Sequence, residues 1–134
     1  MDKICFSKYY SLHLRLKFHI YHTMKVQELV EKLGLKVLSG EKGLEHEIEG
    51  CYVSDLLSDV MGNAESGNVW ITLQTHKNVM AVASLKELAC IILVKGFMPN
   101  EDTINQSNEE EIPILQTSMS TYEVTGRVYE LFRN

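Results

Sequence analysis

The spacing of apolar residues changes several times along the chain, and each spacing predicts a different kind of element. Between residues 26 and 33 the apolar positions recur at i, i+3, i+4 and i+7, which predicts an amphipathic helix that ends at Gly34. Continuous apolar runs at 69–73 and 90–94 are instead typical of strands that are covered on both faces. The pattern therefore predicts helices and buried strands that follow one another along the chain.

The other segments extend this alternation over residues 24–134. Strands are predicted over 35–38, 48–53, 69–73, 90–94 and 113–115. Helices are predicted over 26–33, 56–61, 77–88 and 99–110, and a last one starts at the capping box that Ser120 forms with Glu123. We expect Ser54 or Asp55 to cap the helix at 56–61, and the pair at 62–63 to end it. Strands joined by helices imply right-handed crossovers, so we expect a single α/β domain with a mainly parallel sheet flanked by helices.

Residues 1–23 differ in composition from the rest of the chain. They are basic and aromatic, with four basic side chains against one acidic, and their apolar residues between 12 and 18 alternate with polar ones at a strand-like period. At Met24 the sequence changes abruptly to the pattern of the first helix. We interpret 1–23 as an atypical leader that precedes the natural start at Met24, and the alternative is a genuine β-arm.

Charge and cysteine content exclude several classes of protein. The 134-residue chain has a net charge of −5, and residues 24–134 carry 9 basic against 17 acidic side chains, so they offer no basic face to nucleic acid. Three cysteines without a C-x-x-C pair fit the reducing cytoplasm, and Cys51 and Cys90, which fall in predicted strands, are expected to be buried thiols. No apolar run is long enough to cross a membrane, and His13, His19 and His22 have no carboxylate beside them. We therefore expect neither a membrane partner nor a metal site.

The sequence carries no recognisable catalytic motif. Its nearest approach to a phosphate loop is the G-x-x-x-x-G spacing at 62–67, which lacks the following Lys and Ser/Thr and precedes a strand instead of leaving one. A helix end and a turn account for these glycines more simply. We therefore predict that the protein is not an enzyme and holds no cofactor.

Polar residues follow four of the predicted strands, and the carboxyl ends of parallel strands meet at one edge of a sheet, where ligands bind. The candidate ligand-binding residues are Ser54, Asp55, Thr72, Gln74, Thr75, His76, Asn78, Lys95, Gly96 and Thr117. The helix that starts near His76 would offer free backbone N–H groups and the positive end of its dipole to an anion. Lys95 would add a mobile charge, and Gly96 would allow close approach of the backbone. The competing interpretation is that these residues only end strands and cap helices.

Several stretches resemble the DRTGG domain. They are Val69–Thr72, His76–Asn78, Ala89–Gly96, Ile112–Leu115 and Ser120–Glu123, and the resemblance covers about residues 24–132. Residues 50–62 are similar to stand-alone DRTGG proteins of anaerobic bacteria. The resemblance implies a fold similar to the amino-terminal domain of HPr kinase/phosphorylase and to the middle domain of some phosphotransacetylases.

The resemblance also implies a function. In some inorganic pyrophosphatases the domain lies between CBS-domain halves and takes part in binding a diadenosine polyphosphate and in dimerisation. The family's Asp-Arg falls near Thr75-His76 here and its Thr-Gly-Gly at Val94–Gly96, so only Gly96 is kept. We expect a small cytoplasmic regulatory or sensor module, a homodimer, that binds an adenine nucleotide or another anionic metabolite such as a phosphorylated one. The alternative is a protein-interaction or scaffold subunit with no small-molecule ligand.

Overall fold

The computed structural model describes residues 23–133, in which strands and helices alternate. The elements are β1 (Met24–Lys25), α2 (Val26–Leu33), β2 (Lys36–Ser39), the 3-10 turn η1 (Glu41–Gly43), β3 (Glu47–Ile48), β4 (Gly50–Val53), α3 (Leu57–Asn63), β5 (Asn68–Thr72), α4 (Asn78–Leu85), β6 (Cys90–Leu93), α5 (Glu101–Glu110), β7 (Ile114–Gln116) and α6 (Thr121–Arg133). The interpretation of residues 1–23 as a leader concerns residues that lie, apart from Thr23, outside the described part.

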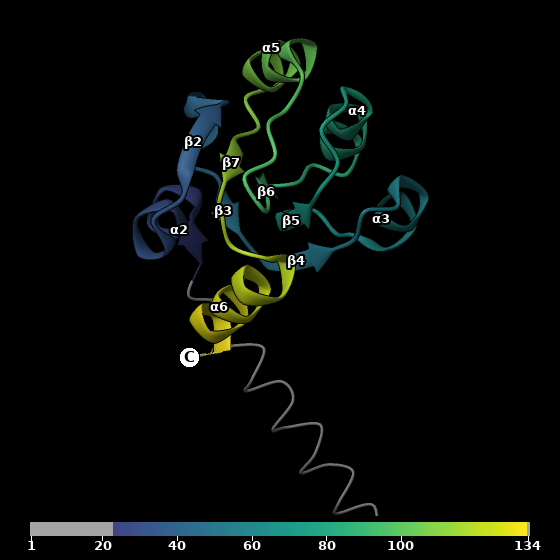
Figure 1. The fold of residues 1–134 in the computed structure, drawn as a ribbon. Coiled ribbons are helices and arrows are strands. Elements are labelled where there is room, and N and C mark those ends of the chain that lie inside the picture. Colours follow the sequence, from purple (N-terminus) through teal and green to yellow (C-terminus); the bar gives the residue numbers. More distant parts are fainter. Residues whose placement is uncertain (1–22, 134) are drawn as a thin grey trace, which may run out of the picture.

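A five-stranded sheet forms the centre of the domain, with the strand order β2-β7-β6-β5-β4 (Figure 1). The four strands β4 to β7 run parallel to one another, and β2 pairs antiparallel with β7. The predicted α/β domain with a mainly parallel sheet is therefore confirmed. A second, two-stranded sheet joins β1 to β3, in which Met24 lies opposite Ile48.

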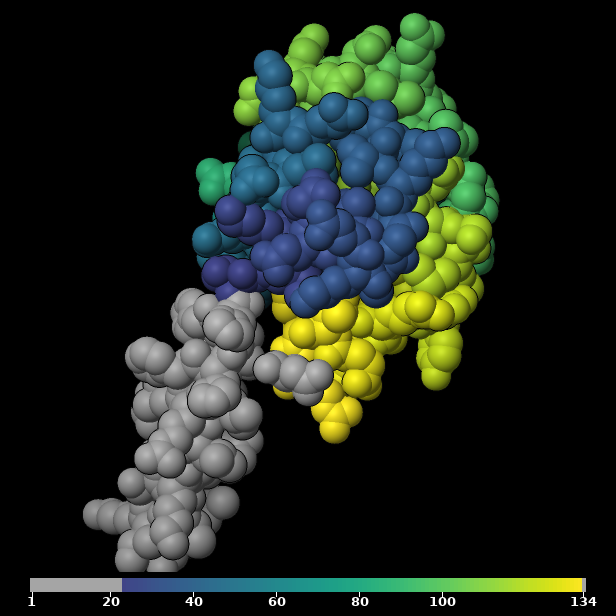
Figure 2. All heavy atoms as spheres, turned by 90° about the vertical axis from the view of Figure 1, so that its left-hand side faces the viewer, coloured from purple at the N-terminus to yellow at the C-terminus, as the bar shows by residue number. Residues whose placement is uncertain are grey.

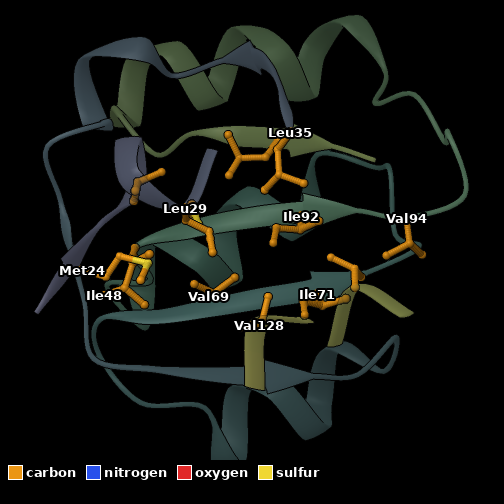
Figure 3. Close-up of a cluster of buried hydrophobic side chains, with 14 residues drawn as sticks. Met24, Leu29, Leu35, Ile48, Val69, Ile71, Ile92, Val94 and Val128 are labelled. Atoms are coloured by element: carbon orange, nitrogen blue, oxygen red, sulfur yellow. The ribbon is translucent and has the colours of Figure 1, made fainter. Parts of the chain in front are cut away.

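Helices cover both faces of the large sheet. α3, α4 and α5 lie on one face, and α2 and α6 lie on the other (Figure 1). Because side chains alternate along a strand, Trp70 packs with α3 and α4, whereas its neighbours Val69 and Ile71 pack with α2 and α6. Figure 3 shows the cluster on the face of α2 and α6, where Leu29 from α2 and Val128 from α6 contact side chains of the strands.

Several predicted element boundaries differ from those in the structure. The strand predicted over 48–53 is interrupted at Glu49, because Ile48 pairs with β1 whereas the chain from Gly50 onward pairs with β5. The helix predicted over 56–61 runs from Leu57 to Asn63, so the pair at 62–63 forms its last two residues and ends it there. The helix predicted over 77–88 is shorter and ends at Leu85. The predicted Ser120 cap of α6 is confirmed, since its Oγ accepts a hydrogen bond from the Glu123 backbone N–H at 3.2 Å.

The two cysteines of the sheet have different surroundings. Cys90 lies on the central strand β6 and is buried, as predicted. The prediction is wrong for Cys51, which is exposed because β4 is the outermost strand and has a neighbour on one side only. Desolvation nevertheless raises the pKa of the Cys51 thiol to about 12, and it also raises that of Cys90. Both thiols are therefore protonated near neutral pH and are poor nucleophiles.

Candidate ligand site at the carboxyl ends of the strands

The parallel strands β4 to β7 end at the same side of the sheet, here called the carboxyl edge: residues 54–55, 72–78, 95–98 and 116–118. The connections through α3, α4 and α5 all leave toward one face, whereas α6 leaves β7 toward the other (Figure 1). Neighbouring connections therefore diverge only between β6 and β7. In open α/β sheets, ligands bind in the crevice that such a divergence opens.

Hydrogen bonds join the two loops at this divergence. The Gly96 backbone N–H donates to the Thr117 carbonyl at 2.8 Å, and the Lys95 N–H donates to the Met119 carbonyl at 2.9 Å. The Gln116 side-chain amide donates to the Gly96 carbonyl at 3.2 Å. The backbone donors of Lys95 and Gly96 are therefore occupied, and a ligand here would contact side chains.

Lys95 and Gly96 both have left-handed backbone conformations, with φ values of +56° and +71°. This conformation costs a residue with a Cβ atom roughly 1–2 kcal/mol. A Cβ atom built on Gly96 would meet no atom of the described chain within 4 Å, so its positive φ is the one feature of the chain that favours glycine there. The expected close approach of a ligand to this backbone stays a prediction. Lys95 keeps an exposed side chain in a strained conformation, a combination that is enriched at functional sites.

At the other end of the carboxyl edge, three candidate residues bind one another. Asp55 Oδ1 accepts hydrogen bonds from the Thr72 hydroxyl at 2.9 Å and from the Leu73 backbone N–H at 2.8 Å. The Gln74 side-chain amide donates to the Asp55 carbonyl at 2.8 Å. Thr72 is only 1% exposed. These contacts join the loop after β4 to the loop after β5. Asp55 therefore does not cap α3, although the sequence analysis names it as a candidate cap.

Ser54 belongs to a neighbouring cluster that the sequence did not reveal. Its carbonyl accepts a hydrogen bond from the Trp70 indole N–H at 2.8 Å, and its hydroxyl accepts from the Leu56 N–H at 3.2 Å, so it closes a turn ahead of α3 instead of capping the helix. The hydroxyl groups of Ser54 and then Tyr52 lower the pKa of Asp59, which accepts the Tyr52 hydrogen bond at 2.8 Å. Asp59 is thus held as a carboxylate near neutral pH.

Thr75 and His76 lie where the loop after β5 meets the start of α5. The Thr75 carbonyl accepts hydrogen bonds from the Asn100 backbone N–H at 3.2 Å and from the Thr103 hydroxyl at 2.9 Å. The Asn100 side-chain amide lies 3.0 Å from His76 Nδ1, which leaves Nε2 of the exposed ring free for another partner. Asn100 therefore positions His76, a role that only the tertiary structure shows.

The amino terminus of α4 has backbone donors to spare. The N–H groups of His76, Lys77 and Asn78 have no acceptor among residues 23–133, and the first turn of α4 contains no acidic side chain. By contrast, Glu101 and Asp102 lie in the first turn of α5 and neutralise its positive end. α4 is therefore the better place for an anion along this edge, and the exposed Lys77 joins the candidate residues.

The ten predicted residues thus fall into three groups along one edge. Asp55, Thr72 and Gln74 are joined at β4 and β5 with Ser54 beside them, Thr75, His76 and Asn78 lie around the start of α4, and Lys95, Gly96 and Thr117 lie between β6 and β7. Their role in ligand binding stays a prediction. Among the described residues, no group of three or more His, Cys, Asp or Glu side chains could hold a metal ion, and no helix is long and apolar enough to cross a membrane.

A hollow lies near the opposite edge of the sheet, at the start of β5 and β6. It has a volume of about 410 Å³, and its lining includes His46, Glu47, Glu49, Glu87 and Glu110. Four carboxylates at neutral pH would repel an anion. An anionic ligand is therefore expected at the carboxyl edge and not in this hollow.

Comparisons with known proteins agree with this architecture. The sequence matches the family described as "DRTGG domain" over residues 28–131. Among solved structures, the fold is similar to the CBS and DRTGG domains of the regulatory region of Clostridium perfringens pyrophosphatase, complexed with the activator diadenosine tetraphosphate. That similarity has a TM-score of 0.63 at 11% sequence identity, and it covers 88% of this chain but only 48% of the other. No curated protein matches the sequence significantly. Since the family match extends over most of the sequence, this chain belongs to the DRTGG domain family.

Proposed function

We propose that this protein is a small regulatory module that binds an adenine nucleotide or another phosphorylated metabolite at the carboxyl edge, without catalysing a reaction. The observation that carries this proposal is the set of unoccupied N–H groups at the start of α4, together with the lysines at 77 and 95. Membership of the DRTGG family supports the regulatory role, since the similar pyrophosphatase region is a regulatory region in complex with a dinucleotide. This chain spans about half of that region.

The edge offers different chemistry to the two ends of a nucleotide. Phosphate oxygens would accept hydrogen bonds from the N–H groups of His76, Lys77 and Asn78 and would be favoured by the helix dipole. Phe97 and Met98 expose apolar side chains next to Lys95, and an adenine ring can stack on such a surface. The ligand would thus lie along the edge from α4 toward the divergence of β6 and β7.

The proposal that the protein is not an enzyme rests on the state of its potential catalytic side chains. One carboxylate oxygen of Asp55 is engaged by Thr72 and Leu73. The thiols of Cys51 and Cys90 have raised pKa values, so they are not activated as nucleophiles. We therefore expect the purified protein neither to hydrolyse ATP nor to transfer its phosphoryl group above background.

Calorimetric titration tests the ligand. Diadenosine tetraphosphate, ATP and uncharged adenosine should bind in descending order of affinity, because phosphate contacts supply most of the energy. Lys77→Ala should weaken ATP binding about tenfold or more, as expected for one lost charge-assisted contact. Lys42→Ala removes an equally exposed lysine from η1 and is the matched control. Equal affinities of the two variants would refute the site, and no binding at millimolar concentration would refute the ligand class.

A protein-interaction subunit without a ligand is the second candidate function. Large apolar side chains are exposed on two separate helices, with Leu85 71% exposed on α4 and Tyr122 91% exposed on α6. Exposed apolar groups of this size mark interaction surfaces when they gather on one face. We also propose that the protein is a cytoplasmic homodimer, and the exposed face of α6 suggests where the two copies meet.

A further inference from the structure

Gln116 is the last residue of β7, and its side chain holds the turn that follows β6. Its Nε2 amide donates to the Gly96 carbonyl at 3.2 Å, to the Phe97 carbonyl at 3.0 Å and to Met98 Sδ at 2.8 Å. Figure 2 shows the two segments side by side at the right of the domain, the chain after β6 in green and the chain after β7 in yellow-green. Sequence spacing alone does not reveal these contacts, because Gln116 lies 18 to 20 residues from its partners.

The three acceptors fix the orientation of the Gln116 amide. If its nitrogen and oxygen were exchanged, Oε1 would face the two carbonyl oxygens of Gly96 and Phe97, and acceptors repel one another. Nε2 therefore faces the turn, and both of its hydrogens are used there. Oε1 accepts no hydrogen bond from residues 23–133, and the side chain is only half-buried. A hydrogen-bond acceptor of fixed orientation is therefore available where the connections after β6 and β7 diverge.

The turn that Gln116 holds carries two large apolar side chains. The Phe97 N–H donates to the Val94 carbonyl at 3.1 Å, and both central residues of this turn have positive φ, as in a type I′ turn. Phe97 and Met98 follow directly and are 46% and 55% exposed. A flat ring can stack on exposed apolar side chains whose backbone is held in this way. Since Met98 also contacts the Gln116 amide, the stacking surface adjoins the free Oε1.

We propose that Gln116 selects the base of the nucleotide: its Oε1 accepts a hydrogen bond from the exocyclic amino group of adenine while the ring stacks on Phe97 and Met98. This inference rests on the proposed function and names the residue that gives the site its base specificity. An acceptor beside an apolar surface favours a ring that carries an amino group over one that carries a carbonyl oxygen at the same position, because two acceptors repel. Gln116 is thus a specificity-determining residue and not a phosphate contact.

The polarity of the carboxyl edge agrees with this orientation of the ligand. The unoccupied N–H groups at the start of α4 and the side chain of Lys77 favour phosphate, whereas the free Oε1 of Gln116 repels it. β5, which precedes α4, and β7 are separated in the sheet by β6 alone, so the two ends of the site are about 10 Å apart by the usual strand spacing. The ribose separates the base from the phosphates in a nucleotide, so one ligand can reach both ends.

Calorimetric titration of the full chain with three ligands tests the role of Gln116. The ligands are ATP, purine riboside triphosphate, which differs from ATP only in lacking the 6-amino group, and tripolyphosphate, which has no base. The unsubstituted protein should bind purine riboside triphosphate about three- to tenfold more weakly than ATP, as expected for one lost hydrogen bond between neutral groups. Gln116→Met keeps the side-chain length without the amide and should bind both nucleotides with equal affinity. Its affinity for tripolyphosphate should be unchanged.

Two further variants separate base recognition from support of the turn. Gln27→Met makes the same change at a half-buried glutamine on α2 and should keep the preference for ATP. Met98→Leu removes the sulfur acceptor but keeps an apolar side chain and the Gln116 Oε1, so it should keep the preference as well. If Gln116→Met weakened tripolyphosphate and ATP equally, Gln116 would only support the loop, and its role in specificity would be refuted.

The remaining outcomes distinguish this inference from the ligand proposal. Equal affinities of the unsubstituted protein for ATP and purine riboside triphosphate, or a preference for ATP that survives in Gln116→Met, would overturn the role of Gln116 and leave the phosphate site standing. Failure of both ATP and tripolyphosphate to bind at millimolar concentration would refute the proposed function and this inference together.

Discussion

Lys95 allows the backbone strain and the ligand contact at the carboxyl edge to be measured separately. Its φ of +56° costs a residue with a Cβ atom roughly 1–2 kcal/mol, and Lys95→Ala retains this cost because alanine keeps the Cβ. Lys95→Gly removes it, although glycine gains about 0.5–1 kcal/mol of conformational freedom in the unfolded chain. The net expectation is that Lys95→Gly is about 1 kcal/mol more stable than Lys95→Ala. For a domain of this size that difference is about 4 °C in the unfolding midpoint.

The charge of Lys95 has a different readout. Its side chain is exposed, so Lys95→Ala should leave the free energy of unfolding almost unchanged. If the ammonium contacts a phosphate, both variants should lose about 1.5–3 kcal/mol of binding energy, which is roughly tenfold to a hundredfold in affinity. Urea unfolding and calorimetric titration of the two variants provide the measurements. Equal stabilities of the glycine and alanine variants would refute the strain argument, and wild-type affinities would show that Lys95 is a surface charge only.

Three further predictions concern other parts of the domain. Ser107→Ala should lower the free energy of unfolding in urea by about 1–3 kcal/mol, because the buried Ser39 hydroxyl donates to Ser107 Oγ at 2.8 Å and would lose its acceptor. Replacing both serines should cost less than the sum of the two single changes. Gly40→Ala should cost about 3 kcal/mol, because φ is +70° and the new Cβ would clash with the backbone carbonyl oxygen of Ile112. An unchanged midpoint would contradict this. Tyr52→Phe should raise the pKa of Asp59 toward its ordinary value in a carboxyl NMR titration. Since a lowered carboxyl pKa stabilises the fold above the unfolded value of about 3.9, the stability lost in Tyr52→Phe should disappear as the pH falls through the folded pKa.

The type and order of the elements could be predicted from the sequence because helical and strand periods are local properties. The apolar runs around Val69 and Cys90 become the two central strands, since only strands with neighbours on both sides bury every side chain. The same reasoning placed the polar strand ends at one edge, because parallel strands joined by right-handed crossovers must end together. Local periodicity does not indicate which strand is outermost, and Cys51 is exposed for that reason.

What the candidate site can do was decided by contacts between loops that are distant in sequence. The sequence places Asp55 after a strand, but its partner Thr72 lies 17 residues further along, and their hydrogen bond occupies Oδ1 of the carboxylate. The N–H of Lys95, whose φ is left-handed, likewise donates to the carbonyl of Met119, a residue that the pairing of β6 with β7 brings close. The sequence by itself therefore determined which polar residues gather at the carboxyl edge. The tertiary structure decided which of them are used up in holding the loops together, because hydrogen-bond partners depend on strand order and not on local spacing.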